Sequence, residues 1–252
     1  MSGRQTRFSI ITVCFNAERS IASTIASVAI QVYEDYEHLI IDGASRDNTC
    51  RIAEDNAHSR LRIHSEPDNG IYDAMNKGAA RAGGDVLLFL NADDRLADDR
   101  VLSDVAALFA ARPELQLVYG DVAHASGDGG LVELPQPRHL TRPVLAVTTI
   151  CHQSLFARRE VFEKIGPFRE EFPVVSDWDW LYRAIMIERL PIGRLDRTIA
   201  VIGMEGVSHM VDFEPEKRKA LRQYYTAAEV LRYRAAPLVL RRAKARLKRC
   251  WS

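Results

Sequence analysis

FSIITVCFNAERSIASTIASVAIQV, residues 8–32, contains the pattern that decides the fold. Its first seven residues form a continuous apolar run rich in β-branched side chains, which is typical of a strand buried on both faces. Residues 18–32 then place isoleucine and valine at three- and four-residue spacing, which predicts an amphipathic helix. A strand followed directly by a helix is the first half of a strand–helix–strand unit.

The same alternation continues to about residue 111. Further strands are predicted at 38–42, 61–65 and 86–90, and further helices at 47–58, 71–82 and 99–111. The short connections between them favour parallel strands joined by right-handed crossovers. We therefore expect an α/β protein with a mostly parallel central sheet flanked by helices.

The second half of the chain has a less regular pattern. Strands are predicted at 117–119 and 195–202, an irregular or hairpin segment at 120–137, and helices at 158–165, 177–189 and 214–234. Pro237 interrupts the last helical pattern, and a basic helix follows it. We therefore expect a main domain over residues 1–212 and a C-terminal helical basic extension over residues 213–252.

The composition is that of an ordinary globular protein. Of 252 residues, 47% are hydrophobic and 27% charged, with 34 basic and 34 acidic side chains, which excludes disordered and collagen-like classes. The four cysteines include no CxxC pair, so zinc-ribbon and redox motifs have no support. No apolar run reaches the ~18–20 residues of a membrane-spanning helix, and the first residues do not resemble a signal peptide. We therefore expect a cytoplasmic protein.

Charge is distributed unevenly along the chain. Residues 215–252 contain twelve Lys and Arg against two Glu, so the rest of the chain is acidic. The last stretch, 237–252, combines six basic residues with leucine and valine, a composition that lets a helix lie on an anionic bilayer. A solvated charged helix is the alternative. The acidic body argues against nucleic acid as a partner.

Acidic and amide side chains follow two of the predicted strands. Asp42 ends the second strand, and Asn91, Asp93 and Asp94 follow the fourth. Because the carboxyl ends of parallel strands meet at one edge, we expect these groups near one another, where a divalent cation bound to substrate phosphates would relieve their repulsion. Helix capping by the Asp93–Asp94 pair is the alternative. Neither GxGxxG after the first strand nor GxxxxGK[ST] is present, which favours nucleotide-diphospho-sugar chemistry.

Five segments, the first of them part of the stretch quoted above, occur in a fixed order along the chain. They are FSIITVCFNAERSIASTIASV (8–28), LIIDGASRDNT (39–49), SEPDNGIYDAMNKGAARAGGDVLLFLNADD (65–94), CHQSLFARREVFEKIGPF (151–168) and SDWDWLYRA (176–184). Together they resemble the inverting family 2 glycosyltransferases, above all the bacterial enzymes that build exopolysaccharide, capsule and O-antigen. The resemblance runs from about residue 8 to 208 and implies a GT-A type nucleotide-diphospho-sugar transferase fold.

The resemblance implies a donor site at the strand ends, with a UDP-sugar favoured. Asp42 would accept the N–H of the base, and Lys77 would contact phosphate. Met75 stands where many members of the family have arginine before the next asparagine. The implied nucleotide-binding residues are Thr12, Phe15, Asn16, Asp42, Asp68, Asn76, Lys77, Asn91 and Ala92.

A divalent metal, Mn²⁺ or Mg²⁺, is also implied. Asn91-Ala92-Asp93 stands at the family's DxD motif with Asn91 in place of the first acid, which leaves Asp93 and Asp94 as ligands. His209, in a C-terminal loop, is a further candidate ligand. In the family's ED motif, Asp177 matches the catalytic carboxylate. A position at the start of a helix keeps this carboxylate ionised.

Several alternatives remain open for these residues. Ser176 stands in place of the Glu of the ED motif, and Asp179 competes with Asp177 for the role of base. His152 and Gln153 match an acceptor-side segment, although a lone histidine is often structural. Trp178 could stack on an acceptor sugar, but its helical spacing also suits core packing.

The implied reaction is a single in-line displacement on a nucleotide sugar, with inversion, by a hydroxyl of a glycan or of a polyprenyl-diphosphate-linked acceptor. The basic tail would then lie on the inner face of the membrane. Two other functions are considered. A nucleotidyltransferase would need a Gly-rich, Arg-containing loop after the first strand, which CFNAERS (14–20) lacks. A catalytically inactive sugar-nucleotide-binding scaffold is the second, because Met75, Asn91 and Ser176 depart from the commonest pattern.

Overall fold

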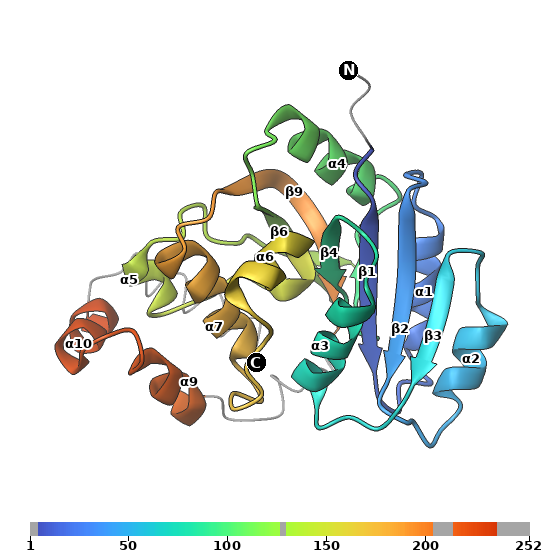
Figure 1. Ribbon diagram of the computed structural model, residues 1–252, viewed down its shortest axis with the longest axis horizontal. Coiled ribbons are helices and arrows are strands. Elements are labelled where there is room, and N and C mark those ends of the chain that lie inside the picture. The colour runs from blue at the N-terminus through green and yellow to red at the C-terminus, as the bar shows by residue number, and fades with distance from the viewer. Residues whose placement is uncertain (1–4, 127–129, 204–213, 236–252) are drawn as a thin grey trace.

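The computed structural model describes residues 5–126, 130–203 and 214–235 as an α/β fold built on one curled sheet (Figure 1). The strands run in the order β3-β2-β1-β4-β8-β6-β9-β5, with β7 paired to β6. Their bounds are β1 Phe8–Cys14, β2 Tyr36–Asp42, β3 Leu61–Ser65, β4 Val86–Phe89, β5 Arg95–Leu96, β6 Leu117–Ala125, β7 Leu131–Leu134, β8 Leu155–Arg158 and β9 Ile192–Ile202.

The α-helices that connect and cover these strands have the following bounds: α1 Ile21–Ala29, α2 Thr49–Asp55, α3 Ile71–Arg81, α4 Val101–Ala111, α5 Arg142–Leu145, α6 Arg159–Ile165, α7 Ser176–Tyr182, α9 Glu214–Leu221 and α10 Ala227–Ala235. Two short turns complete the set, the 3₁₀ turn η1 His152–Ser154 and the π turn η2 Arg183–Ile187, which continues α7.

The first half of the sheet is parallel, as the sequence predicts. Strand β1 pairs in parallel with β2 and β4, and β2 pairs in parallel with β3. Every residue of β1, β2 and β4 is buried, which explains why these strands are continuous apolar runs. The carboxyl ends of β1, β2 and β4 therefore share one rim.

The second half changes the character of the sheet. Strand β8 lies between β4 and β6 and is antiparallel to both, and β5 is antiparallel to β9. Strand β6 is antiparallel to β7 and parallel to β9. With these pairs included, the sheet as a whole is mixed rather than mostly parallel. The four residues of β8 lie next to η1 and carry too short a pattern to predict a strand.

Alternate residues of β1 feed two hydrophobic layers. Ile11 and Val13 face the layer that contains α3 and α7, whereas Phe8 and Ile10 face the layer beneath α1 and α4. Helix α3 approaches the sheet closely at Gly78, where an added Cβ would stand 2.4 Å from the Ile11 side chain. Figure 1 shows α3, α6 and α7 in front of the sheet in this view.

The predicted helix over 214–234 is two helices, α9 and α10. The break occurs at Thr226, whose backbone N–H and hydroxyl both donate to Glu229 Oε2, at 2.8 and 2.9 Å, while the Glu229 N–H donates to the Thr226 hydroxyl at 3.2 Å. This reciprocal capping box starts α10. Ala220, Leu221 and Tyr225 join the main core. The expected basic tail, 236–252, lies outside the described residues, and within the described ranges no helix is long and apolar enough to cross a membrane.

Candidate active site

Asp42, at the end of β2, is fully buried and hydrogen-bonded within its own fold. Its Oδ2 accepts from the Ser65 hydroxyl at 2.6 Å, the Ser45 backbone N–H at 3.0 Å and the Cys50 thiol at 3.2 Å, and its Oδ1 accepts from the Ser45 hydroxyl. Burial acts to raise the pKa of Asp42, but these hydrogen bonds outweigh it and lower the pKa. Asp42 shapes the 42–45 turn and, in this structure, does not present a free oxygen to a base.

Asp68 and Phe15 meet above Gly43 instead. An added Cβ on Gly43 would stand 2.4 Å from Asp68 Oδ2 and 3.4 Å from the Phe15 ring. The Phe15 side chain is 59% exposed, and Asp68 Oδ1 accepts from the Gly70 N–H at 2.9 Å. An exposed aromatic face beside a carboxylate is the arrangement that stacks on a base and accepts its N–H.

Two other residues predicted to contact the nucleotide, Thr12 and Asn76, form hydrogen bonds inside the protein. The Thr12 hydroxyl is fully buried and lies 2.9 Å from His38 Nε2. The Asn76 amide forms two 2.9 Å hydrogen bonds with the backbone of Phe168, one as donor and one as acceptor. Both side chains are therefore tied to the fold by these bonds, and Thr12 is also closed to a ligand by its burial.

Asn16 and Lys77 tie loops at the same rim. Asn16 has a positive φ of 52°, and its Oδ1 accepts from the Arg46 N–H at 2.9 Å. Lys77 Nζ donates to the Pro67 carbonyl at 2.8 Å and pairs with Asp73 at 3.0 Å, so it holds the loop that carries Asp68. Met75 is fully buried, which shows that this position supplies no cation to a diphosphate.

The segment after β4 brings Asn91, Asp93 and Asp94 to the rim. Asp94 is 2% exposed, and its Oδ1 accepts from the Gly203 N–H at 2.8 Å. Burial and the neighbouring charge of Asp93 raise the pKa of Asp94 to about 7. Ala92 is buried, and its carbonyl accepts from the Thr24 hydroxyl at 2.8 Å, so the segment is fixed through its backbone.

The donor atoms of this segment fit a hard divalent cation. Asn91 Oδ1 and Asp94 Oδ2 are buried and lack a hydrogen-bond partner, and carboxylate and amide oxygens are the ligands that Mg²⁺ and Mn²⁺ prefer. The described residues contain no set of three His, Cys, Asp or Glu placed to hold a metal. The remaining ligands would then be diphosphate oxygens and water. His209, the third predicted ligand, lies outside the described residues.

Asp177 lies in the first turn of α7, and its side chain is 19% exposed. Its Oδ1 accepts from the Trp178 N–H at 2.7 Å and the Tyr72 hydroxyl at 3.1 Å, and its Oδ2 lies 3.3 Å from His152 Nδ1. No Lys or Arg pairs with Asp177 among the ion pairs of the described residues. Such a carboxylate keeps a lone pair that can accept a proton.

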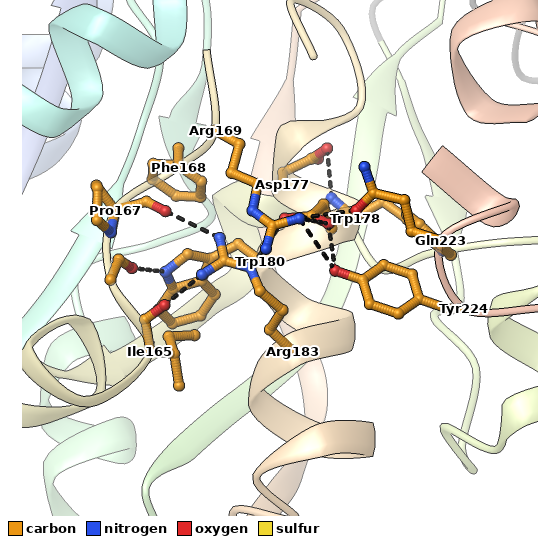
Figure 2. A network of polar contacts seen from close by, with 12 residues as sticks. Ile165, Pro167, Phe168, Arg169, Asp177, Trp178, Trp180, Arg183, Gln223 and Tyr224 are labelled. Carbon is orange, nitrogen blue, oxygen red and sulfur yellow. Dashed lines mark hydrogen bonds and ion pairs between the residues drawn. The ribbon is translucent and has the colours of Figure 1, made fainter. Parts of the chain in front are cut away.

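Asp179, the competing acid, is fully buried in an ionic cluster. Its Oδ2 accepts from Arg183 Nε at 2.9 Å, and its Oδ1 accepts from the Tyr224 hydroxyl at 2.6 Å and lies 3.5 Å from Arg169. Figure 2 shows Arg183 extending to the carbonyl oxygens of Ile165 and Pro167. Asp179 therefore holds α7 in place and is closed to an acceptor.

The three predicted acceptor contacts differ in position. Trp178 is 1% exposed and donates through Nε1 to the Leu145 carbonyl at 2.8 Å, so the prediction of an acceptor contact for Trp178 is wrong and its role is core packing. His152 turns toward Asp177, and Gln153 lies beside Asp94 and offsets part of the rise in the Asp94 pKa. Ser176, which directly precedes Asp177 and stands in place of the Glu of the ED motif, is also fully buried.

Sequence reasoning missed Tyr72 and Gly203. Tyr72 looks like an ordinary apolar position of α3, and nothing in its spacing points to Asp177. An added Cβ on Gly203 would stand 2.4 Å from Asp93 Oδ2 and 2.7 Å from the Asp93 backbone. The glycine that follows the late strand, at 203, was a usable signal of such a close approach.

Comparison with known proteins identifies the family of this chain. The family model "Glycosyl transferase family 2" matches residues 9–166. The chain is 39% identical over 182 residues to a PGL/p-HBAD biosynthesis glycosyltransferase of Mycobacterium bovis, covering 70% of this chain and 68% of that protein.

Solved structures support the fold. The structure of S. aureus TarS 1-349 in complex with UDP-GlcNAc has a TM-score of 0.70 at 20% identity, covering 96% of this chain and 70% of that one. The mannosyltransferase PcManGT from Pyrobaculum calidifontis, in complex with GDP-Man and Mn²⁺, has a TM-score of 0.65 at 21% identity, covering 98% and 75%. With the family model matching more than half of its length, the chain belongs to glycosyl transferase family 2.

Proposed function

We propose that the protein is an inverting, metal-dependent glycosyltransferase that moves a sugar from a nucleotide-diphospho-sugar, with a UDP-sugar favoured, to a hydroxyl of a glycan or lipid-linked acceptor in bacterial cell-surface glycan synthesis. The observation that carries the proposal is the Asp177 carboxylate, which is partly exposed and hydrogen-bonded by neutral donors. A relative that acts in PGL/p-HBAD biosynthesis and the UDP-GlcNAc and GDP-Man complexes of the structural neighbours support it.

The donor would bind across the rim formed by β1, β2 and β4. Its base would stack on the exposed ring of Phe15 and donate its N–H to Asp68, whose carboxylate lies over Gly43. Asn16 would line the same rim, with Lys77 holding the loop behind Asp68. This arrangement favours uracil or guanine over a base without a ring N–H at its recognised edge.

Asp177 would act as the general base. It would take the proton of the acceptor hydroxyl as the oxygen attacks the anomeric carbon, a contribution of typically 10²–10⁴-fold. A single displacement inverts the configuration at that carbon. Asp93, Asp94 and Asn91 would hold Mn²⁺ or Mg²⁺, whose charge stabilises the departing diphosphate.

The acceptor would enter from the side of Asp177, past His152 and Gln153. A polyprenyl-diphosphate-linked or other lipid-linked acceptor would bring the protein to the inner face of the membrane. The basic stretch 237–252, six of whose residues are Lys or Arg, would then contact anionic lipids.

Calorimetric titration with UDP, GDP and dTDP, each with and without Mn²⁺, tests the donor site. We expect metal-dependent binding of one nucleotide that Asp93→Ala abolishes. Asp55→Ala is the matched control, because Asp55 is 62% exposed on α2 and pairs with Arg51 in an i,i+4 salt bridge. Nucleotide affinity that is the same with and without Mn²⁺, and the same in Asp93→Ala, would contradict the metal assignment.

Turnover separates the enzyme from an inactive scaffold. Release of the nucleoside diphosphate from the matching nucleotide sugars is measured with a panel of octyl glycosides as acceptors. Release that depends on the acceptor, with an inverted anomeric product by NMR, supports the proposal. Tight nucleotide binding with no release for any sugar would favour the sugar-nucleotide-binding scaffold.

A further inference from the structure

The Asp177 carboxylate is held by two side chains that come from distant parts of the chain. The Tyr72 hydroxyl, from α3, lies 3.1 Å from Oδ1, and His152 Nδ1, from η1, lies 3.3 Å from Oδ2. Each oxygen therefore has one side-chain donor. The backbone N–H of Trp178, at 2.7 Å from Oδ1, is adjacent in sequence and cannot by itself set the rotation of the carboxylate.

Tyr72 is placed to donate. It is 5% exposed, packs against the ring of Phe168, and its hydroxyl also lies 2.9 Å from the Val174 carbonyl. Both neighbours of the hydroxyl are acceptors, so the phenol can only donate to them, and its single proton is shared between the Val174 carbonyl and the Asp177 carboxylate. Burial raises the pKa of Tyr72 well above its ordinary value, so the proton is retained.

His152 is placed to act through Asp177 rather than on a substrate. Its side chain is 15% exposed, and its Nε2 atom is buried with no hydrogen-bond partner. A hydrogen bond from this ring to the carboxylate requires a proton on Nδ1. In that tautomer the ring presents its N–H to Asp177.

The start of α7 has a backbone anchor besides the bond from the Tyr72 hydroxyl to the Val174 carbonyl. Glu216 of α9 accepts from the backbone N–H groups of Val174 and Val175, each at 2.8 Å. Because the backbone is fixed in this way, loss of one donor frees the carboxylate without releasing the helix. The two side chains thus control orientation more than folding.

We propose that Tyr72 and His152 are positioning residues, which together hold the Asp177 carboxylate in the orientation that accepts the proton of the attacking hydroxyl. This inference rests on the proposed role of Asp177 as the base. Oδ1 accepts from two donors and Oδ2 faces one, so the lone pair left for the proton of the attacking hydroxyl is on Oδ2. A misplacement of a reacting group by about 1 Å can lower a rate by 10²-fold.

The test uses four variants of the full chain. Tyr72→Phe removes only the hydroxyl, His152→Leu removes the ring N–H, His152→Asn keeps a donor at the Nδ1 position, and Asp177→Asn removes the base. Release of the nucleoside diphosphate is followed with the nucleotide sugar and octyl glycoside on which the wild type is most active. The kcat, the donor KM and the melting temperature are measured for each.

We expect Tyr72→Phe and His152→Leu to lower kcat by about 10- to 100-fold with donor KM little changed. His152→Asn should recover most of the loss, because its amide donates from the same place. A fall in kcat matched by a large fall in melting temperature, or wild-type kcat in both variants while Asp177→Asn is inactive, would overturn the inference alone. Full activity of Asp177→Asn would overturn the proposed base as well.

A second measurement does not depend on turnover. In ¹⁵N-histidine NMR spectra of the full chain, with His152→Asn to assign the signal, the His152 ring should be the Nδ1–H tautomer. An Nε2–H tautomer would exclude the hydrogen bond to Asp177 and overturn the role of His152.

Discussion

Two carboxylates lie two residues apart at the start of α7, and their surroundings differ in kind. Asp177 faces α3 and η1 and meets the polar donors Tyr72 and His152. Asp179 is fully buried and pairs with Arg183, whose side chain is 11% exposed, and with Arg169, whose side chain is 40% exposed. The difference teaches that a carboxylate that stabilises the fold can be recognised by a largely buried cationic side chain paired with it. One left for chemistry has donors that orient it without neutralising it.

The largest effect expected from this comparison is on catalysis at Asp177. Asp177→Asn should lower transfer by about 10²–10⁴-fold, while the free energy of unfolding changes by no more than about 1 kcal/mol, because the amide remains partly exposed. Initial rates and urea unfolding of the same preparation measure both quantities. Normal transfer by this variant would remove the distinction between the two carboxylates.

The opposite result is expected at Asp179. Asp179→Asn leaves Arg183 buried without its anion, which should cost about 3–5 kcal/mol of unfolding free energy. Asp55→Asn is the matched control, because the Asp55–Arg51 pair is more than 60% exposed on both sides and should be worth less than about 0.5 kcal/mol. Equal losses in the two variants, measured by urea denaturation, would show that burial does not decide the cost.

A smaller change sharpens the same contrast. Tyr224→Phe removes one donor, at 2.6 Å, from the buried Asp179 carboxylate. Hydrogen bonds to charged groups contribute about 1.5–3 kcal/mol, so the variant should be less damaging than Asp179→Asn and should keep its donor binding. Thermal unfolding followed by circular dichroism provides the measurement. A loss as large as that of Asp179→Asn would mean that the tyrosine ring packing matters more than its hydroxyl.

The smallest effect depends on pH and lies away from both carboxylates. Burial lowers the pKa of His38 to about 3 from 6.5, so below pH 6.5 the unfolded chain binds a proton that the folded chain does not. Stability should fall by about 1–2 kcal/mol between pH 7 and pH 5 through this group. His38→Gln should remove that part of the pH dependence in urea unfolding, whereas exposed His139→Gln should not.

The elements of residues 8–111 other than β5 were predictable because each is long enough to show its pattern. The helix break at Thr226 was missed, although Thr226 and Glu229 have the spacing of a capping box. Strand β5 has only two residues, and β8 has three apolar residues before Arg158, so neither shows the continuous apolar run that marks residues 86–90. Both strands depend on partners far away in sequence. The mixed character of the sheet follows from those partners.

At the site, the resemblance placed the right segments at the rim. It could not say which polar side chains form hydrogen bonds within the protein instead of facing a ligand. Thr12, Asp42 and Asn76 are polar residues of matching motifs, yet each is hydrogen-bonded within the protein. That outcome depends on three-dimensional neighbours such as His38 and Ser65. The preference for Asp177 over Asp179 came from motif position, and the Arg183 contact now supplies a physical reason.

The position of β8 between β4 and β6 has a consequence for how the chain folds while it is being translated. Strand β4 ends at Phe89, but its partner β8 begins only at Leu155. A nascent chain that has already assembled β1 to β4 therefore carries an unpaired apolar edge until the ribosome has added that later segment. Such an edge can pair with another chain, so slow translation between these two strands is expected to increase aggregation, and early chaperone binding to reduce it.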